Sequence, residues 1–123
     1  MAARRIAVDD QSIGAQLAAW GKVALLETRG RVSGRPFTAA VGFVEQADGS
    51  LLVAAGSEAS DWAQNLRANP VCRVTIEDLT SNYDATEVDG DARAAAITAH
   101  ILKYGTPAER LGHGPVFRLA SRR

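Results

Sequence analysis

Residues 37–56, FTAAVGFVEQADGSLLVAAG, decide the fold because they form two apolar segments joined by a short polar turn. Every second residue from Phe37 to Phe43 is apolar, which predicts a half-buried strand over residues 37–46. The Asp48-Gly49 pair that follows is the strongest short hairpin signal in the chain. The returning segment, SLLVAAG, is too apolar to be exposed on both faces. These residues therefore predict an antiparallel hairpin with a buried second strand.

The rest of the chain continues this pattern of strands with a few short helices. Consecutive hairpins imply antiparallel pairing, because a parallel crossover needs about a dozen residues. We expect a mainly β (α+β) single domain over residues 1–123, an antiparallel sheet of about six strands that curls into a small barrel with two or three helices. Asp91 is expected to cap the last helix. Further strands are predicted at residues 23–29, 71–79, 83–88 and 114–121, and helices at about 10–21, 61–69 and 92–104.

Composition excludes several classes of protein. The 14 Lys and Arg balance the 14 Asp and Glu, so there is no global attraction to nucleic acid or an acidic membrane. Cys72 is the one cysteine, which excludes an internal disulfide and a thiolate metal cluster. There is no apolar run of about 18 residues that would cross a bilayer, and the N-terminus lacks the apolar core of a secretion signal. We expect a cytoplasmic protein that is not an integral membrane protein.

Positive charge gathers at the bend between the first two predicted strands, residues 27–38, ETRGRVSGRPFT. We call residues 29–35 the arginine loop, since Arg29, Arg31 and Arg35 surround two glycines there. Glycine lets backbone amides approach a ligand closely, and guanidinium groups donate forked hydrogen bonds to phosphate or carboxylate oxygens. A solvated turn whose arginines keep a sheet edge from aggregating is the plainer interpretation. The loop alone leaves both open.

Two motifs in sequence order carry a family resemblance. The loop has the pattern G-R-x-[ST]-G, and a later segment has the pattern W-x-x-N-L-x-A-N-P. Together, over about residues 22–120, the chain resembles the deazaflavin-dependent nitroreductase family. The matching residues are Gly30, Arg31, Ser33, Gly34, Trp62, Asn65, Leu66, Ala68, Asn69 and Pro70.

The resemblance implies a split β-barrel, of the kind that also binds FMN, and an oxidoreductase that uses coenzyme F-420. This 8-hydroxy-5-deazaflavin carries a phosphodiester and a glutamate tail, and it transfers hydride from its C5 atom to an electron-poor small organic substrate. The basic loop would then bind the anionic part of the coenzyme. The cofactor-binding residues that the resemblance implies are Arg31, Val32, Ser33, Gly34, Arg35, Thr38, Ala55, Gly56, Ser57, Trp62 and Asn65.

The candidate residues have plainer alternatives. Trp62 fits a core anchor, and Asn65 fits a cap for a neighbouring backbone group. Tyr104 is a candidate proton donor or substrate contact, although a core-facing helix residue is more often structural. His100 and His113 have no carboxylate spaced for a triad or a metal set, so neither is assigned to catalysis and no metal is expected.

Two departures from the family pattern keep other ligands open. The family often carries Lys at the position of Val32 and Arg at the position of Phe37, and Arg35 compensates part of that charge. The alternative is a related split barrel that binds FMN, haem or a fatty acid without this reductase activity. Nucleic acid is not expected as a partner, because no aromatic residues interleave with the arginines. A homodimer is expected, because SLLVAAG and Phe117 would leave apolar faces to cover.

Overall fold

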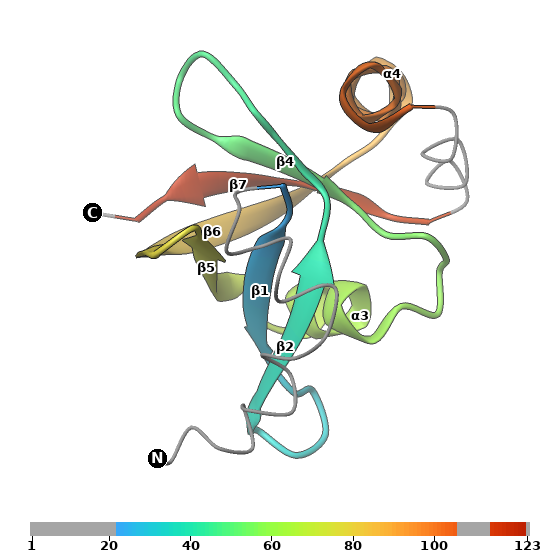
Figure 1. Cartoon of the computed structure of the whole chain (residues 1–123). Helices are drawn as coiled ribbons and strands as arrows, with labels where there is room; N and C mark the ends of the chain where they lie inside the picture. The colour runs from blue at the N-terminus through green and yellow to red at the C-terminus, as the bar shows by residue number, and fades with distance from the viewer. Residues whose placement is uncertain (1–21, 106–113, 123) are drawn as a thin grey trace.

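The structure is a computed structural model that describes residues 22–105 and 114–122 (Figure 1). One antiparallel sheet of seven strands, in the order β2-β1-β5-β6-β7-β4-β3, forms the body of the described chain. The predicted helix at about 10–21 lies outside the described residues. The elements are β1 (Ala24–Arg29), β2 (Pro36–Val41), β3 (Phe43–Glu45), β4 (Leu51–Ala54), α3 (Asp61–Ala68), β5 (Val71–Ile76), β6 (Leu79–Val88), α4 (Gly90–Tyr104) and β7 (Val116–Ser121).

The two edge strands of the sheet, β2 and β3, are neighbours in the sequence and are separated by Gly42 alone. The sheet therefore curls until one short stretch of chain belongs to both of its edges, which gives the predicted split-barrel class. The prediction of a single strand over residues 37–46 is wrong, because the chain divides there into β2 and β3. A Cβ atom at Gly42 would stand 3.2 Å from Cε2 of Tyr104, so the absence of a side chain lets the strand bend there beneath α4.

The predicted hairpin at Asp48-Gly49 is confirmed. β3 pairs with β4 in the register Phe43↔Val53, and Gly49 has a φ of +86°. The Ser50 hydroxyl and amide donate hydrogen bonds to the Asp48 carboxylate at 2.6 and 2.9 Å. These bonds hold the pKa of Asp48 well below its usual range, and the nearby Arg118 guanidinium adds to the effect.

The core lies inside the curled sheet, where Trp62 of α3 packs against Phe117 of β7 with ring centroids 6.0 Å apart. A second cluster joins the outer face of β4 to α4 through Ala96. Because β4 lies between the core and α4, all four residues of β4 are buried, and so is Phe117. The expectation that SLLVAAG and Phe117 leave apolar faces for a partner is therefore wrong.

Several element boundaries differ from the sequence predictions, and the strand expected over residues 71–79 ends at Ile76. β6 begins at Leu79 rather than Tyr83, because a two-residue turn pairs Ile76 directly with Leu79. Glu77 takes a φ of +58° to make this turn, a conformation that its residue type does not signal. The last helix begins at Gly90, and the residue at its N-cap position is Asp89 rather than Asp91.

In the described part of the chain, no helix is long and apolar enough to cross a membrane. The same residues contain no group of three or more potential metal-binding side chains.

Candidate functional site

The arginine loop is closed by its own backbone. The Gly30 amide donates to the carbonyl oxygen of Arg35 at 2.8 Å, and the Gly34 amide donates to the carbonyl oxygen of Gly30 at 2.9 Å. The Arg35 amide donates to Oγ of Ser33 at 3.1 Å. A Cβ atom on Gly30 would stand 2.8 Å from the same hydroxyl, and Gly34 has a φ of +74°, so both glycines are required by the shape of the loop.

Asn65 fixes this loop to α3. Its side chain is 2% exposed, and its Oδ1 accepts hydrogen bonds from the backbone amide of Arg31 at 3.1 Å and from Nη1 of Arg31 at 2.8 Å. Its Nδ2 donates to Oγ1 of the buried Thr28 at 3.1 Å. Asn65 therefore caps a neighbouring backbone group, as one interpretation of the sequence expected, and its contact with a cofactor stays a prediction.

The charge of Arg31 is compensated within the protein. Its Nη2 lies 3.2 Å from Oδ1 of Asp61, and its Nη1 donates to the Asp61 carbonyl oxygen at 3.3 Å. Sequence reasoning missed Asp61 as a site residue. Its position four residues before Asn65, on the same face of α3, is the signal that would have identified it.

Other donors of the loop remain open. Within the described residues, the amides of Val32 and Ser33 have no hydrogen-bond acceptor, and the Arg35 guanidinium has no partner. Arg29 donates from Nη1 to the Gly34 carbonyl oxygen at 2.8 Å, a bond that leaves its charge uncompensated. The loop can thus offer two amides and two guanidinium groups to an anion.

A cavity of about 260 Å³ lies between the loop and α3. Four of the predicted cofactor-binding residues, Arg31, Val32, Ser33 and Asn65, line it together with Asp61. Val32 is 94% exposed, and Phe37 completes an apolar side of the cavity. The predicted residues Gly34, Arg35 and Thr38 belong to the same hairpin but do not line the cavity.

The predicted ring-binding residues 55–57 lead from β4 toward α3. Ala55 is buried and its amide donates to the carbonyl oxygen of Pro115 at 2.9 Å, whereas Gly56 and Ser57 are exposed. Gly114 packs so tightly here that a Cβ atom on it would stand 2.5 Å from the Ala55 carbonyl oxygen. A Cβ on Gly56 would meet open space. The chain from segment 55–57 leads into α3 at Asp61, and Arg31 of the arginine loop contacts the same residue.

Trp62 and Tyr104 lie in structural positions. Trp62 belongs to the core. The Tyr104 hydroxyl donates to the Lys22 carbonyl oxygen at 2.6 Å and accepts from the Phe43 amide at 3.1 Å. These bonds attach the end of α4 to the bend at Gly42. The proton-donor assignment of Tyr104 and the cofactor contact of Trp62 stay predictions.

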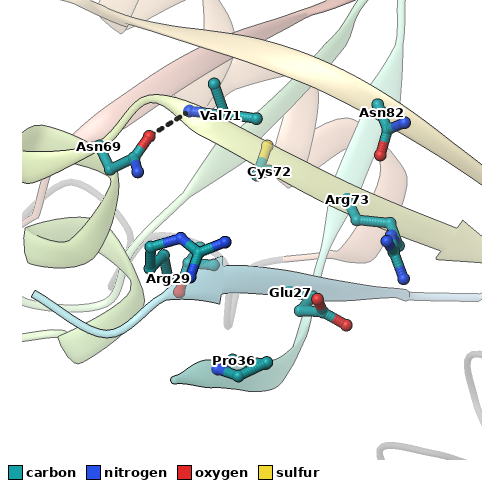
Figure 2. A pocket seen from close by; sticks show the side chains of 9 residues that line it. Glu27, Arg29, Pro36, Asn69, Val71, Cys72, Arg73 and Asn82 are labelled. Carbon is teal, nitrogen blue, oxygen red and sulfur yellow. Dashed lines mark hydrogen bonds between the residues drawn. The ribbon is translucent and has the colours of Figure 1, made fainter. Parts of the chain in front are cut away.

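A second cavity, of about 310 Å³, opens between β1 and β5 and was not anticipated from the sequence (Figure 2). We call it the β1–β5 cleft. Its Cys72 is buried, and this burial raises the pKa of the thiol to about 12, in keeping with the inert role expected for it. The cleft is lined by Glu27, Thr28, Arg29, Pro36, Asn69, Val71, Cys72, Arg73 and Asn82.

Several solved structures share this fold. The haem storage protein HutZ from Vibrio cholerae is 23% identical, with 89% of this chain and 87% of that chain covered and a TM-score of 0.71. A haem-binding protein from Mycobacterium smegmatis is 20% identical, with 89% of this chain and 50% of that chain covered and a TM-score of 0.69. At these identities the likeness concerns the fold alone.

A third solved structure, the F420-H2 dependent reductase FDR-A, is 25% identical, with 80% of this chain and 93% of that chain covered and a TM-score of 0.69. No curated protein matches the sequence. Residues 2–110 match the family described as F420H(2)-dependent quinone reductase. The chain therefore belongs to the F420H(2)-dependent quinone reductase family and is an oxidoreductase whose cofactor is coenzyme F-420.

Proposed function

We propose that the protein reduces an electron-poor small organic substrate of the quinone type, and that the arginine loop binds the anionic part of coenzyme F-420. When bound, the reduced coenzyme supplies a hydride. The observation that carries the proposal is the set of open donors on a loop that Asn65 holds rigidly against α3. The loop and its supporting helix would fix the anion, and with it the position of the reacting ring.

The residues present fit the anionic part of the coenzyme. The loop carries three guanidinium groups, those of Arg29, Arg31 and Arg35, and the Asp61 carboxylate pairs with Arg31. Within the described residues the other two have no ion-pair partner. The amides of Val32 and Ser33, which have no acceptor among the described residues, add neutral donors of the kind that bind phosphate oxygens in backbone concavities. Because Asp61 already compensates Arg31, we expect Arg35 and the two amides to contribute more to binding than Arg31.

The segment 55–57 would lie against the flat ring of the coenzyme. Ala55 and Gly56 present little side-chain bulk, and the open space beside Gly56 allows close approach to the backbone. The apolar side chains of Val32 and Phe37 would exclude water from one side of the cavity. These residues supply position and a low-polarity surface rather than acid–base chemistry.

A substrate that accepts a hydride also takes up a proton. Tyr104 would deliver that proton only by giving up its hydrogen bond to the Lys22 carbonyl oxygen. A Tyr104→Phe variant tests this role directly. Loss of turnover with unchanged cofactor affinity would support Tyr104 as the donor, and unchanged turnover would leave it a structural residue.

The proposal is tested by titrating the protein into coenzyme F-420 and following the fluorescence of the coenzyme. We expect saturable quenching, and turnover of a quinone when the coenzyme is reduced. An Arg35→Gln variant should weaken binding, whereas Lys22→Gln, which removes a charge outside the arginine loop, should not. Absence of binding by the wild-type protein would overturn the proposal.

We further propose a homodimer and a cytoplasmic location. A similar solved structure, 21% identical with a TM-score of 0.67, is described as a domain-swapped dimer. Light scattering during size-exclusion chromatography distinguishes one chain from two. A mass of one chain at micromolar concentration would remove the dimer and leave the cofactor proposal intact.

A further inference from the structure

A third cavity, of about 520 Å³, lies between α4 and the β3–β4 hairpin, and we call it the α4 groove. Alternate residues of β4 pack on the two helices, with Leu51 and Val53 in the core beside α3 and Leu52 and Ala54 against α4. The groove therefore lies on the outer face of the sheet, where Figure 1 shows α4 beside β4. It shares no lining residue with the cavity beside the arginine loop or with the β1–β5 cleft.

The α4 groove has an apolar floor and a wall of small side chains. Val44, Leu52 and Val88 form the floor. The wall is one side of α4 and consists of alanines: Ala92, Ala95, Ala96 and Ala99. Alanines allow the backbone of a second helix to approach closely and leave room for a larger side chain on that helix. The groove would therefore accept a helix that presents a large apolar residue.

A residue of this kind lies on α4 itself. Leu102 is 83% exposed and belongs to the last turn of the helix. Residues 92, 95, 99 and 102 are spaced by three, four and three positions, which is the spacing of the contact face in paired helices. If two copies of α4 run antiparallel about Ile97, Ala92 faces the partner's Leu102 and Ala95 faces the partner's Ala99. Each leucine then occupies the space that the small side chains of the other copy leave.

The charges of α4 favour the same antiparallel orientation. Asp91 lies in the first turn and Lys103 in the last. Both are equally far from Ile97 in the sequence, so this orientation brings Asp91 to the partner's Lys103. Within the described residues neither has an ion-pair partner, although Nζ of Lys103 donates to the Phe43 carbonyl oxygen at 2.6 Å. Parallel helices would instead place like charges next to each other, which disfavours that pairing.

We propose that the α4 groove is the contact surface of a homodimer, in which α4 of a second copy lies antiparallel to α4 and the partner's Leu102 fits against Ala92 and Ala95. This inference rests on the homodimer proposed above and assigns its surface. Because the groove shares no residue with the other two cavities, the contact would leave the candidate cofactor site of both copies accessible.

The experiment measures the dissociation constant of the dimer by sedimentation equilibrium. We expect the wild type to sediment as two chains at micromolar concentration. Leu102→Gln should raise the dissociation constant about tenfold or more, because it removes two leucines from a symmetric interface. Leu79→Gln, at a leucine that is 73% exposed on the turn between β5 and β6, is the matched control and should leave association unchanged. Both leucines are exposed, so we expect both variants to fold and to bind the coenzyme like the wild type.

A second arm tests the orientation of the helices. Proteins carrying Ala95→Cys and Ala99→Cys are mixed under mild oxidation, and we expect a disulfide that joins one variant to the other. Parallel helices would instead join each variant to itself. Ala94→Cys, at an exposed position of α4 that does not line the groove, is the control and should not form the disulfide. The native Cys72 is buried and should not compete.

The outcomes separate this inference from the proposals on which it rests. A dimer that Leu102→Gln leaves intact, or that forms no disulfide between the two cysteine variants, would overturn the α4 contact and leave the homodimer standing. A wild type that sediments as one chain would overturn both, and the groove would then be open to a different partner. The coenzyme titration is independent of all these results, so its failure would count against the proposed function alone.

Discussion

The arginine loop and the β1–β5 cleft both present arginines to solvent, but they use them differently. In the loop, Arg31 is bound to Asp61 and Asn65, so its charge helps hold the loop on α3. In the cleft, the described residues provide no partner for Arg73, although Glu27 stands opposite it in register. The number of arginines in a segment therefore does not give the positive charge available to a ligand. That charge depends on which guanidinium groups already pair with a carboxylate of the protein.

The largest expected effect comes from removing the residue that joins the loop to α3. Asn65→Ala would leave the Arg31 amide and the Thr28 hydroxyl without their buried partner. We expect the free energy of unfolding to fall by about 2–3 kcal/mol, since unsatisfied buried groups cost about that much. Urea denaturation measures it. Gln64→Ala, a neighbour on the same helix, serves as the control, and an equal loss in both variants would contradict the role of Asn65.

The segment 55–57 can be disturbed without changing any charge. A Gly114→Ala side chain would overlap the Ala55 carbonyl and the Ser57 backbone, and we expect a loss of about 1–3 kcal/mol from this overpacking. Gly56→Ala places its Cβ in open space and should leave thermal unfolding nearly unchanged. If Gly114→Ala unfolds like the wild type, the tight packing behind the proposed ring surface is not present in solution.

Asp61→Asn would leave the Arg31 guanidinium without a carboxylate partner, as the Arg73 guanidinium is among the described residues of the β1–β5 cleft. It removes the carboxylate that compensates Arg31 and leaves the Asn65 contacts in place. We expect binding of coenzyme F-420 to tighten by about threefold or more at low salt, because one nearby charge is worth about 1 kcal/mol at a partly exposed site. Isothermal titration calorimetry measures the change. Weaker binding in Asp61→Asn would mean that the ion pair orders the loop for the ligand.

The smallest effect lies away from both regions, at His100 of α4. His100 is fully buried, its Nδ1 is bonded to the Ala96 carbonyl oxygen, and burial lowers its pKa below the ordinary value of about 6.5. The unfolded chain then binds the proton more readily, so stability is full above the unfolded pKa and is lost as pH falls toward the folded one. Unfolding at pH 7.5 and 5.5 measures the loss. His100→Gln should reduce this pH dependence, and an unchanged dependence in His100→Gln would contradict the assignment.

The parts of the fold that depend on residues adjacent in the sequence could be predicted from it. Asp48-Gly49 identified its hairpin, and the alternation in VCRVTI identified β5. The bend at Gly42 could not be predicted, because the ring that packs against it belongs to Tyr104, 62 positions later in the chain. The turn at Glu77 was missed because a glutamate rarely takes a positive φ.

The candidate site, like the fold, could be predicted from the sequence only in part. The G-R-x-[ST]-G pattern identified the loop, but the pairing of Arg31 with Asp61 depends on how α3 packs against the hairpin. The β1–β5 cleft brings together residues of β1, β2, β5 and β6, which no local pattern connects. Electrostatic partners and cavities formed by distant segments are properties of the packed structure.

Binding of the anionic part of coenzyme F-420 by the arginine loop is best measured by a fluorescence titration of the wild type and Arg35→Gln at low and high salt. We expect that the wild type binds, that added salt weakens this binding, and that Arg35→Gln binds more weakly with a smaller dependence on salt. Equal affinity and equal salt dependence in the two proteins would contradict it.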